Sequence, residues 1–247
     1  RSTYAGLHKV IDDPNNNWMI FAKKLICDTN IEVVEKLVPP ALNVAINSYS
    51  KRMKSIEENG CNVPWAILLD PTAACNLRCK GCWAAEYGKN SQLDYETLAR
   101  IIKEAKELGT YMFLYTGGEP LMRKKDLIRL CEENPDCVFM SFTNGTLLDD
   151  EFADELVRVG NFIPAFSIEG HEEENDFRRG DGTYKKVCEA MARLKKRGVP
   201  FGASLCYTSK NTELLASDEY MDWLIEQGVM FAWFFTYMPT GNGAVTE

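Results

Sequence analysis

Three cysteines lie close together in the segment CNLRCKGCW, residues 75–83, with the spacing C-x3-C-x2-C. Cysteine thiolates bind zinc and iron, so three of them on one loop indicate a metal centre. A structural zinc site takes four protein ligands, and an electron-transfer [4Fe–4S] cluster also uses four cysteines. The sequence has no second C-x2-C pair, and its only histidines, His8 and His171, are far away along the chain. Three thiolates therefore predict a metal with an open position, where another molecule binds and reacts.

Six near-continuous apolar runs follow residue 60, and such runs are typical of strands that are buried on both faces. They cover residues 65–69, 111–115, 138–142, 162–167, 201–207 and 230–237. Helical patterns separate them, near residues 94–108, 123–133, 149–159, 183–197 and 213–227. Parallel strands need crossover helices of this kind. The predicted fold class is therefore α/β, as a partial (β/α)6 parallel barrel with an N-terminal helical extension.

A polar or glycine-rich motif ends each predicted strand. The cysteine segment follows the first strand, and the other motifs are TGGEP (116–120), TNGT (143–146), SIEG (167–170), TSKN (208–211) and MPTGNG (238–243). The loops after parallel strands share one rim of a barrel, where the chemistry of such folds takes place. The sequence therefore predicts that these six motifs converge.

The segment CNLRCKGC, together with TGGEP after the next strand, resembles the radical S-adenosylmethionine (radical SAM) superfamily over about residues 62–243. The flanking loops are most similar to the branch with molybdenum-cofactor cyclases, sulfatase-maturing enzymes and peptide maturases that carry a C-terminal SPASM extension. The resemblance implies that Cys75, Cys79 and Cys82 hold one [4Fe–4S] cluster. Its fourth iron would chelate the amino and carboxylate groups of SAM.

The resemblance also implies which residues contact SAM. It places Gly117, Gly118 and Glu119 beside the SAM amino group, and the physics agrees, because glycine allows a close backbone approach and a carboxylate suits an ammonium group. It places Ser167 and Arg178 at the SAM carboxylate, with the adjacent Arg179 as the alternative to Arg178. The other implied contacts, to the methionine part, the ribose and the adenine, are Asn144, Glu169, Thr208, Asn211, Met238 and Pro239.

One position departs from the pattern of the family. Relatives often carry an aromatic residue just before the third cysteine, where it packs on the adenine. Here that residue is Gly81, and the aromatic residue Trp83 comes just after the cysteine instead. The departure leaves the predicted cluster intact but puts this adenine contact in question. Core packing is the alternative role for Trp83.

The activity that the resemblance implies is reductive cleavage of SAM by an oxidoreductase- or transferase-type enzyme. A 5′-deoxyadenosyl radical would then abstract hydrogen from an unactivated C–H bond of the substrate. The electron would come from an external one-electron reductant of the flavodoxin or ferredoxin type. We expect peptide or protein maturation, with a small molecule or a lipid as the alternative substrate. Two other classes stay open, an iron–sulfur redox protein or iron sensor without turnover and a zinc-binding interaction module.

Composition narrows the class of protein. The chain has 247 residues and a net charge of −8, which makes nucleic acid an unlikely partner. No apolar run approaches the roughly 20 residues of a membrane-spanning helix. The nine cysteines are odd in number, and six of them fall singly in apolar segments. We therefore predict a reduced, cytoplasmic protein whose six other cysteines are mostly buried as small hydrophobic residues.

Residues 1–60 form a separate helical extension in this interpretation, and residues 61–243 form the barrel. We expect one helix over about 17–27 and a longer helical pattern over 31–58, broken at Pro39–Pro40. The amphipathic stretch Trp18–Ile26 would cover the bottom of the barrel, or else bind a membrane surface or a protein substrate. We also expect that a cysteine-rich auxiliary region, common in the resembled branch, is missing from this chain.

Overall fold

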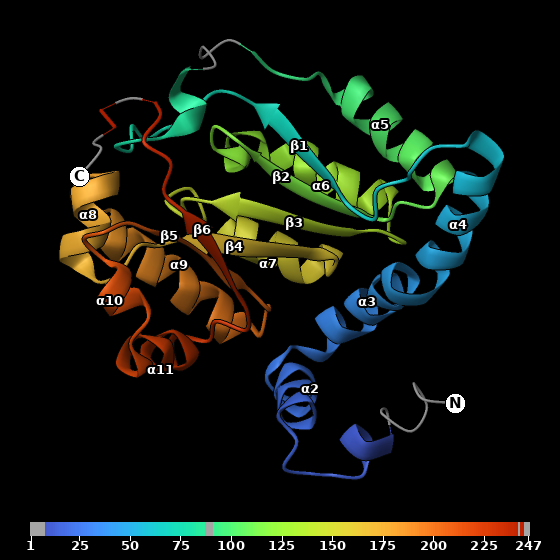
Figure 1. Cartoon of the computed structure of the whole chain (residues 1–247), viewed down its shortest axis with the longest axis horizontal. Helices are drawn as coiled ribbons and strands as arrows, with labels where there is room; N and C mark the ends of the chain where they lie inside the picture. Colours follow the sequence, from blue (N-terminus) through green and yellow to red (C-terminus); the bar gives the residue numbers. More distant parts are fainter. Residues whose placement is uncertain (1–7, 87–90, 242, 245–247) are drawn as a thin grey trace.

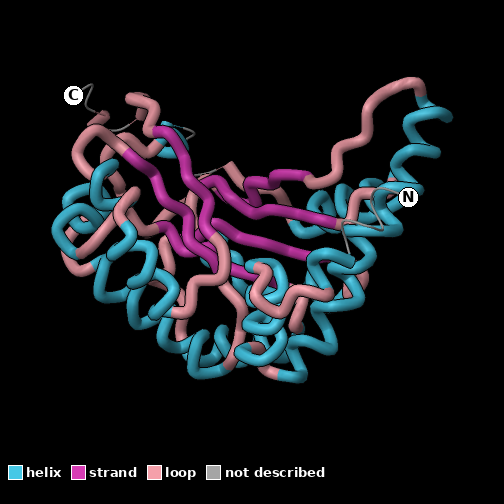
Figure 2. Tube along the Cα trace, turned by 60° about the horizontal axis from the view of Figure 1, so that its bottom comes forward, coloured by secondary structure: helices cyan, strands magenta, loops and turns pink. Residues whose placement is uncertain are grey.

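Six parallel strands form one curved sheet in the order β1-β2-β3-β4-β5-β6. The computed structural model describes residues 8–86, 91–241 and 243–244. The strands are β1 (Ile67–Thr72), β2 (Met112–Gly117), β3 (Val138–Thr143), β4 (Phe162–Ser167), β5 (Gly202–Tyr207) and β6 (Ala232–Thr236). The sheet is open and curled, with helices along its convex side (Figure 2). The predicted partial (β/α)6 barrel is confirmed.

Helices connect the strands and bury one face each. They are α5 (Tyr95–Leu108), α6 (Lys124–Glu133), α7 (Asp150–Val159), α9 (Thr183–Arg197) and α11 (Asp218–Gln227). The side chains of Asp94 and Asp149 cap α5 and α7 by accepting backbone N–H groups. Gly160 ends α7 in the left-handed conformation, with φ of 74°, which glycine adopts without strain. The order of elements can be followed in Figure 1.

The structure contains one helix that the periodicity does not predict. Helix α8 (Glu172–Arg179) lies between β4 and α9, and its sequence EEENDFRR buries only Asn175. A helix without an apolar stripe gives no periodic signal. Its three N-terminal glutamates and two C-terminal arginines instead match the helix dipole.

The region expected as one helix over 213–227 is two helices. These are α10 (Thr212–Leu215) and α11, and Ser217 lies between them. The Ser217 side chain accepts the N–H of Tyr220, so this serine caps α11 rather than continuing a helix.

The predicted break at Pro39–Pro40 is wrong. After a short helical turn at residues 8–11, the extension contains α2 (Asn17–Asp28), α3 (Ile31–Leu42), a π-helical turn at Asn43–Asn47 and α4 (Ser48–Asn59). Helix α3 continues through both prolines, and the Asn43 N–H bonds to the carbonyls of Pro39 and Pro40. Proline removes hydrogen bonds from a helix interior, and the widened turn follows directly after this loss. Tertiary packing supports the helix, since Val33 and Leu37 are buried.

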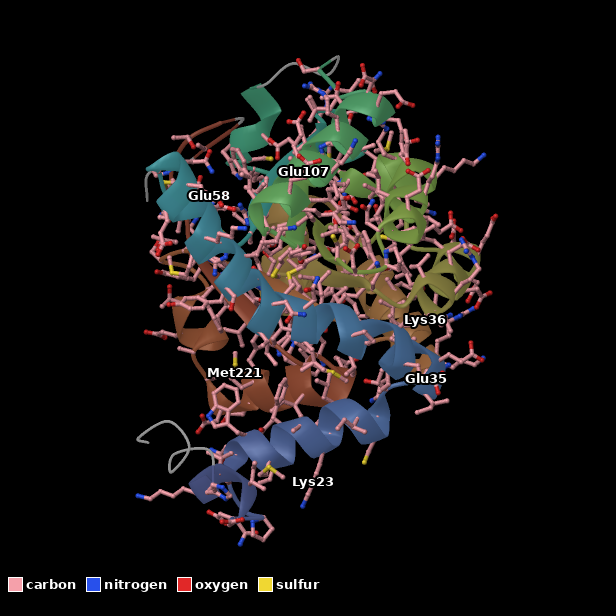
Figure 3. The ribbon with its side chains drawn as sticks, turned by 90° about the vertical axis from the view of Figure 1, so that its right-hand side faces the viewer. Lys23, Glu35, Lys36, Glu58, Glu107 and Met221 are labelled. Carbon is pink, nitrogen blue, oxygen red and sulfur yellow. The ribbon has the colours of Figure 1, made fainter. Side chains whose placement is uncertain are left out.

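Helix α3, rather than α2, packs on the barrel. It lies against α7 and β3, whereas α2 contributes no buried residue. Figure 1 shows that α2 lies beside the end of α3 and away from the sheet. Figure 3 shows the same helix from another side, where its Lys23 is labelled. Covering of the barrel bottom by Trp18–Ile26 is therefore not observed. No helix in the described ranges is long and apolar enough to cross a membrane.

Aromatic rings from neighbouring strands form the centre of the core between the sheet and the helices. Phe113 and Phe139 are paired in register, and their ring centroids lie 5.6 Å apart. Tyr115 stacks on Phe139 at 5.8 Å and on Phe162 at 6.3 Å. Side chains alternate along a strand, so a slip of one residue would expose this whole set. The aromatic stack therefore fixes the register that aligns the loops at the ends of the strands.

Replacement of Phe139 tests this role of the core. Because Phe139 is fully buried, we expect Phe139→Ala to lower the free energy of unfolding by about 3–5 kcal/mol. Ile225→Ala, on α11 at 54% exposure, is the control and should cost under about 0.5 kcal/mol. Chemical denaturation measures both values. Equal losses for the two variants would contradict the role assigned to the stack.

Candidate functional site

A cavity of about 310 Å³ opens at the carboxyl ends of the strands. Its size is within the range of small-molecule pockets. Ten of the residues that were predicted to hold the cluster and SAM line it: Cys75, Cys79, Cys82, Gly117, Gly118, Glu119, Asn144, Ser167, Glu169 and Arg178. They come from the ends of β1, β2, β3 and β4 and from α8. The predicted convergence of these motifs on one rim is therefore what the structure shows.

A second cavity, of about 330 Å³, adjoins the first and shares Glu169, Arg178 and Tyr237 with it. Thr208 and Asn211 line this second cavity. Met238 lines the first and is 67% exposed. Pro239 is exposed and lines neither of them.

Backbone hydrogen bonds join the TGGEP loop to the segment that leads into the cysteines. The Gly118 N–H donates to the Thr72 carbonyl at 2.9 Å, and the Glu119 N–H donates to the Ala74 carbonyl at 2.8 Å. A Cβ atom on Gly118 would lie 2.2 Å from the Ala74 oxygen. Only glycine fits here, and this close approach sets where the loop holding Cys75 begins.

Glu119 is a buried carboxylate with internal donors. It is 1% exposed, and its Oε1 accepts the Leu121 N–H at 2.9 Å and the Thr143 hydroxyl at 2.7 Å. Its Oε2 accepts the Asn144 N–H at 2.8 Å. Burial raises the pKa of Glu119, although these hydrogen bonds oppose the rise. A carboxylate has about four acceptor positions, so one position on Oε2 remains for a ligand.

The three loop cysteines carry free thiols and differ in exposure. Cys75 is exposed, Cys79 is buried and Cys82 is half-buried. The Leu77 N–H donates to Cys75 Sγ at 3.4 Å, and Arg179 Nη1 donates to Cys79 Sγ at 3.9 Å. Burial raises the pKa of Cys75 to about 11 and also raises the pKa of Cys79.

The three loop cysteines fit the ligand set of an iron–sulfur cluster. Within the described residues, no three metal-ligating side chains gather closely enough to hold one metal ion. Each cysteine of a cluster binds a different iron, so its ligands need only face a common cavity, as Cys75, Cys79 and Cys82 do. The hydrogen bonds to two of the sulfurs are also typical of thiolate ligands, whose sulfur accepts from nearby donors.

Glu169 forms a buried ion pair with both arginines of α8. Arg178 Nη1 and Arg179 Nη2 each donate to its Oε1 at 2.6 Å, and Arg179 Nε donates to its Oε2. Burial alone would raise the pKa of Glu169, but the two guanidinium groups outweigh it, so the pKa is lowered. Arg178 and Arg179 thus both belong to the site, whereas the sequence presented them as alternatives.

Arg178 has a donor left over for a ligand. Its Nε is buried and has no hydrogen-bond partner among the described residues. A buried donor without a partner is costly, and such groups are typical of binding sites whose ligand completes the bonding.

The Asn211 side chain forms its hydrogen bonds with other groups of the protein. Its Nδ2 donates to the carbonyls of Glu169 and Cys206 at 3.0 and 3.2 Å, and its Oδ1 accepts the Thr208 N–H at 2.6 Å. The side chain therefore links the ends of β4 and β5. Its place beside the cavity comes from this link, which the turn motif TSKN does not reveal.

An aromatic residue lies against Gly81, although the sequence has none before the third cysteine. A Cβ atom on Gly81 would lie 2.3 Å from the Tyr237 hydroxyl oxygen, so the Tyr237 ring fills that space. The end of β6 thus supplies the ring that position 81 lacks, and Trp83 is 45% exposed rather than in the core. The only sequence signal for Tyr237 as a residue of the site is its position directly after the last strand, at the end of a run of aromatic residues.

The expectation for the other six cysteines was partly wrong. Cys131 and Cys137 are buried, whereas Cys27 and Cys61 are exposed. Cys206 lines the first cavity from β5. It is two residues after Ser204, which also lines the cavity, and this alternation is the signal that could have identified it.

Comparison with known proteins agrees with the site. The model of the Radical SAM superfamily matches residues 69–213, more than half of the chain, and the chain therefore belongs to this superfamily. Members of this family bind SAM and a [4Fe–4S] cluster. Membership of this superfamily supports an enzymatic function for the chain.

Curated relatives include two enzymes whose names refer to different kinds of molecule, a porphyrin and a protein. The chain is 27% identical over 183 residues to the Fe-coproporphyrin III synthase of Methanosarcina barkeri, covering 72% of this chain and 45% of the relative. It is 29% identical over 174 residues to the serine-type anaerobic sulfatase-maturating enzyme of Bacteroides thetaiotaomicron, covering 61% and 41%. The chain thus spans less than half the length of these relatives.

A solved structure shares the fold. SuiB of Streptococcus suis bound to S-adenosylmethionine superposes with a TM-score of 0.67 at 19% identity, covering 79% of this chain and 46% of that chain. This likeness supports the partial barrel as the common fold.

The close contact at Gly118 can be tested by adding a single methyl group. We expect Gly118→Ala to lower the free energy of unfolding by more than about 2 kcal/mol, because the new Cβ meets the Ala74 carbonyl. Gly182→Ala is the matched control: its φ is 75°, but nothing lies within 4 Å, so only about 1 kcal/mol of backbone strain is expected. Thermal or chemical denaturation compares the two. A loss at Gly118 no larger than that at Gly182 would disprove the close approach.

Proposed function

We propose that this chain holds one [4Fe–4S] cluster on Cys75, Cys79 and Cys82 and binds SAM beside it for radical chemistry. The observation that carries the proposal is that the three cysteines and seven of the predicted SAM contacts line one cavity. When bound, the reduced cluster would supply the electron for cleavage of SAM into methionine and a 5′-deoxyadenosyl radical, and that radical would abstract hydrogen from a C–H bond. The protein would act as an oxidoreductase- or transferase-type enzyme.

The residues around the cavity suit the methionine part of SAM. The remaining acceptor position of Glu119 suits the ammonium group, and Gly117 and Gly118 allow a close approach. The Ser167 hydroxyl and the buried, unpartnered Nε of Arg178 are donors for the carboxylate. This assignment orients both charged groups of one amino acid.

The neighbouring cavity suits the nucleoside part. Glu169, which both cavities share, keeps one acceptor position on Oε2, which we assign to a ribose hydroxyl. Asn144 would be a second polar contact from the first cavity. The Tyr237 ring and the loop from Thr208 would border the adenine. Asn211 would act indirectly, by holding that loop, and Met238 and Pro239 would contribute backbone.

The substrate would meet the radical on the concave face of the sheet. Phe142, Trp233 and Phe235 pack together there, with ring centroids 5.5 to 6.4 Å apart. Phe235 is 41% exposed, so a bound substrate that covers this face would displace water from around the reacting atoms. Because Cys75 is exposed, we assign delivery of the electron, by an external reductant of the flavodoxin or ferredoxin type, to its side of the site.

We propose a peptide or protein as the substrate, on the basis of the sulfatase-maturating relative. A small molecule or lipid is the second candidate, favoured by the aromatic concave face and by the relative named for a porphyrin product. The two candidate substrates differ in the contacts that they need. A peptide has polar backbone groups that need hydrogen-bond partners, whereas an apolar small molecule or lipid can bind through the dispersion contacts that the aromatic face offers.

Turnover can be tested directly under anaerobic conditions. The chain is reconstituted with iron and sulfide, then supplied with dithionite and SAM, and 5′-deoxyadenosine is measured by mass spectrometry. We expect about four iron and four sulfide per chain and formation of 5′-deoxyadenosine. The Cys75→Ala/Cys79→Ala/Cys82→Ala variant should form none. A loaded protein that binds no SAM would support an iron–sulfur sensor instead, and a single zinc would support an interaction module.

The role of Glu119 has its own test. We expect Glu119→Gln to weaken SAM binding at least about tenfold, because the ammonium group loses its ionic partner. Cluster content should stay unchanged, since Glu119 is not among the proposed ligands of the cluster. Glu133→Gln, on the surface end of α6, serves as the control and should bind SAM normally. Calorimetric titration of the reconstituted proteins gives the affinities, and equal Kd values for all three would remove Glu119 from the SAM site.

A further inference from the structure

Arg179 connects the buried ion pair to a cysteine of the predicted cluster. Its Nε and Nη2 are held by Glu169, and its Nη1 points to Cys79 Sγ at 3.9 Å, within the range of hydrogen bonds to sulfur. We propose that Arg179 is a positioning residue that raises the reduction potential of the cluster, and that Glu169 limits this rise. The proposal rests on the proposed cluster site.

The geometry of the guanidinium group explains why this contact is fixed. A guanidinium has five N–H donors in one plane, and a carboxylate that accepts from two of its nitrogens sets the orientation of the third. Glu169 is 1% exposed and Arg179 is 12% exposed, so neither side chain is free to turn. The direction of Nη1 toward Cys79 therefore follows from the fork that Arg179 forms with Glu169.

Charge gives the direction of the effect. Reduction adds one negative charge to a cluster, so a nearby positive charge and an N–H donor to sulfur stabilise the reduced form. The contact is buried and salt screens it weakly. The Glu169 carboxylate acts in the opposite direction, because its negative charge partly neutralises the same guanidinium group.

This balance matters for the proposed reaction. A cluster that is very hard to reduce cannot be reduced by its donor, whereas one that is easily reduced lacks the driving force to cleave SAM. Arg179 and Glu169 would place the potential between these limits. Cys79 is the cluster ligand through which both act, and neither residue needs to touch the iron.

The test measures potentials, not activity, and SAM is left out. Each protein is reconstituted anaerobically with iron and sulfide and titrated with dithionite and redox mediators, and the reduced cluster is followed by its electron paramagnetic resonance signal. For Arg179→Gln we expect the equilibrium constant of one-electron reduction to fall about tenfold, a shift of about 59 mV to more negative potential. For Glu169→Gln we expect a shift to more positive potential. Arg179→Lys keeps the charge and should shift less than Arg179→Gln.

Opposite shifts for the two glutamine variants separate an electrostatic role from a structural one. Loosening of the site would move both variants in the same direction or move neither, and either result would overturn the proposal. Arg129→Gln, which breaks an exposed pair with Glu133, is the control and should keep the wild-type potential. If Arg179→Gln loads no cluster, Glu169→Gln decides: a positive shift supports the proposal, and any other result overturns it.

The outcome is distinguishable from failure of the proposed function. A wild-type chain that loads a [4Fe–4S] cluster and forms 5′-deoxyadenosine upholds the function, whatever the potentials of the variants. A wild-type chain that loads no cluster overturns both proposals together.

Discussion

The site depends on one buried ion pair, between Glu169 at the end of β4 and the two arginines of α8. A carboxylate at 1% exposure would be unfavourable by itself, yet the pKa of Glu169 is lowered, because Arg178 and Arg179 outweigh burial. The pair holds α8 over the end of β4. Helix α8 in turn holds the cysteine loop, since the Lys80 N–H donates to the Arg178 carbonyl at 2.8 Å. Loss of either partner would leave an uncompensated charge at the point where these segments meet.

A second carboxylate, Glu119, lies across the cavity under a different constraint. It is held by neutral N–H and hydroxyl donors, and burial raises its pKa. Its hydrogen bond from Asn144 also ties the end of β2 to the end of β3. Neutral donors leave the charge of Glu119 available to a cationic ligand, whereas the arginines neutralise that of Glu169. In the proposed site, one side of the cavity would therefore receive an ammonium group and the other a carboxylate, which is the charge pattern of an amino acid.

The sequence predicts the barrel well, because strands that are buried on both faces appear as apolar runs between periodic helices. It also predicts the rim, since parallel strands bring their carboxyl ends together. It does not predict α8, whose polar residues are held by ion pairs, or the continuation of α3 through Pro39–Pro40, which tertiary packing supports. Nor does it separate Arg178 from Arg179, because only the fold shows that both reach Glu169. Tyr237 contacts Gly81 from the far end of the chain, beyond any local pattern.

The polar rim and the aromatic concave face would serve different tasks, which are generation of the radical and binding of the substrate. The rim carries the charges that would orient SAM, and the concave face below it carries Phe142, Trp233 and Phe235. Aromatic side chains on a concave face recognise shape and exclude water, but they give few directional bonds. Generation of the radical would thus be specified by the loops that follow the strands and by α8. Selection of one hydrogen atom also needs directional contacts such as hydrogen bonds. Polar groups elsewhere in the cavity, or on segments outside the sheet, would have to form these bonds with the substrate.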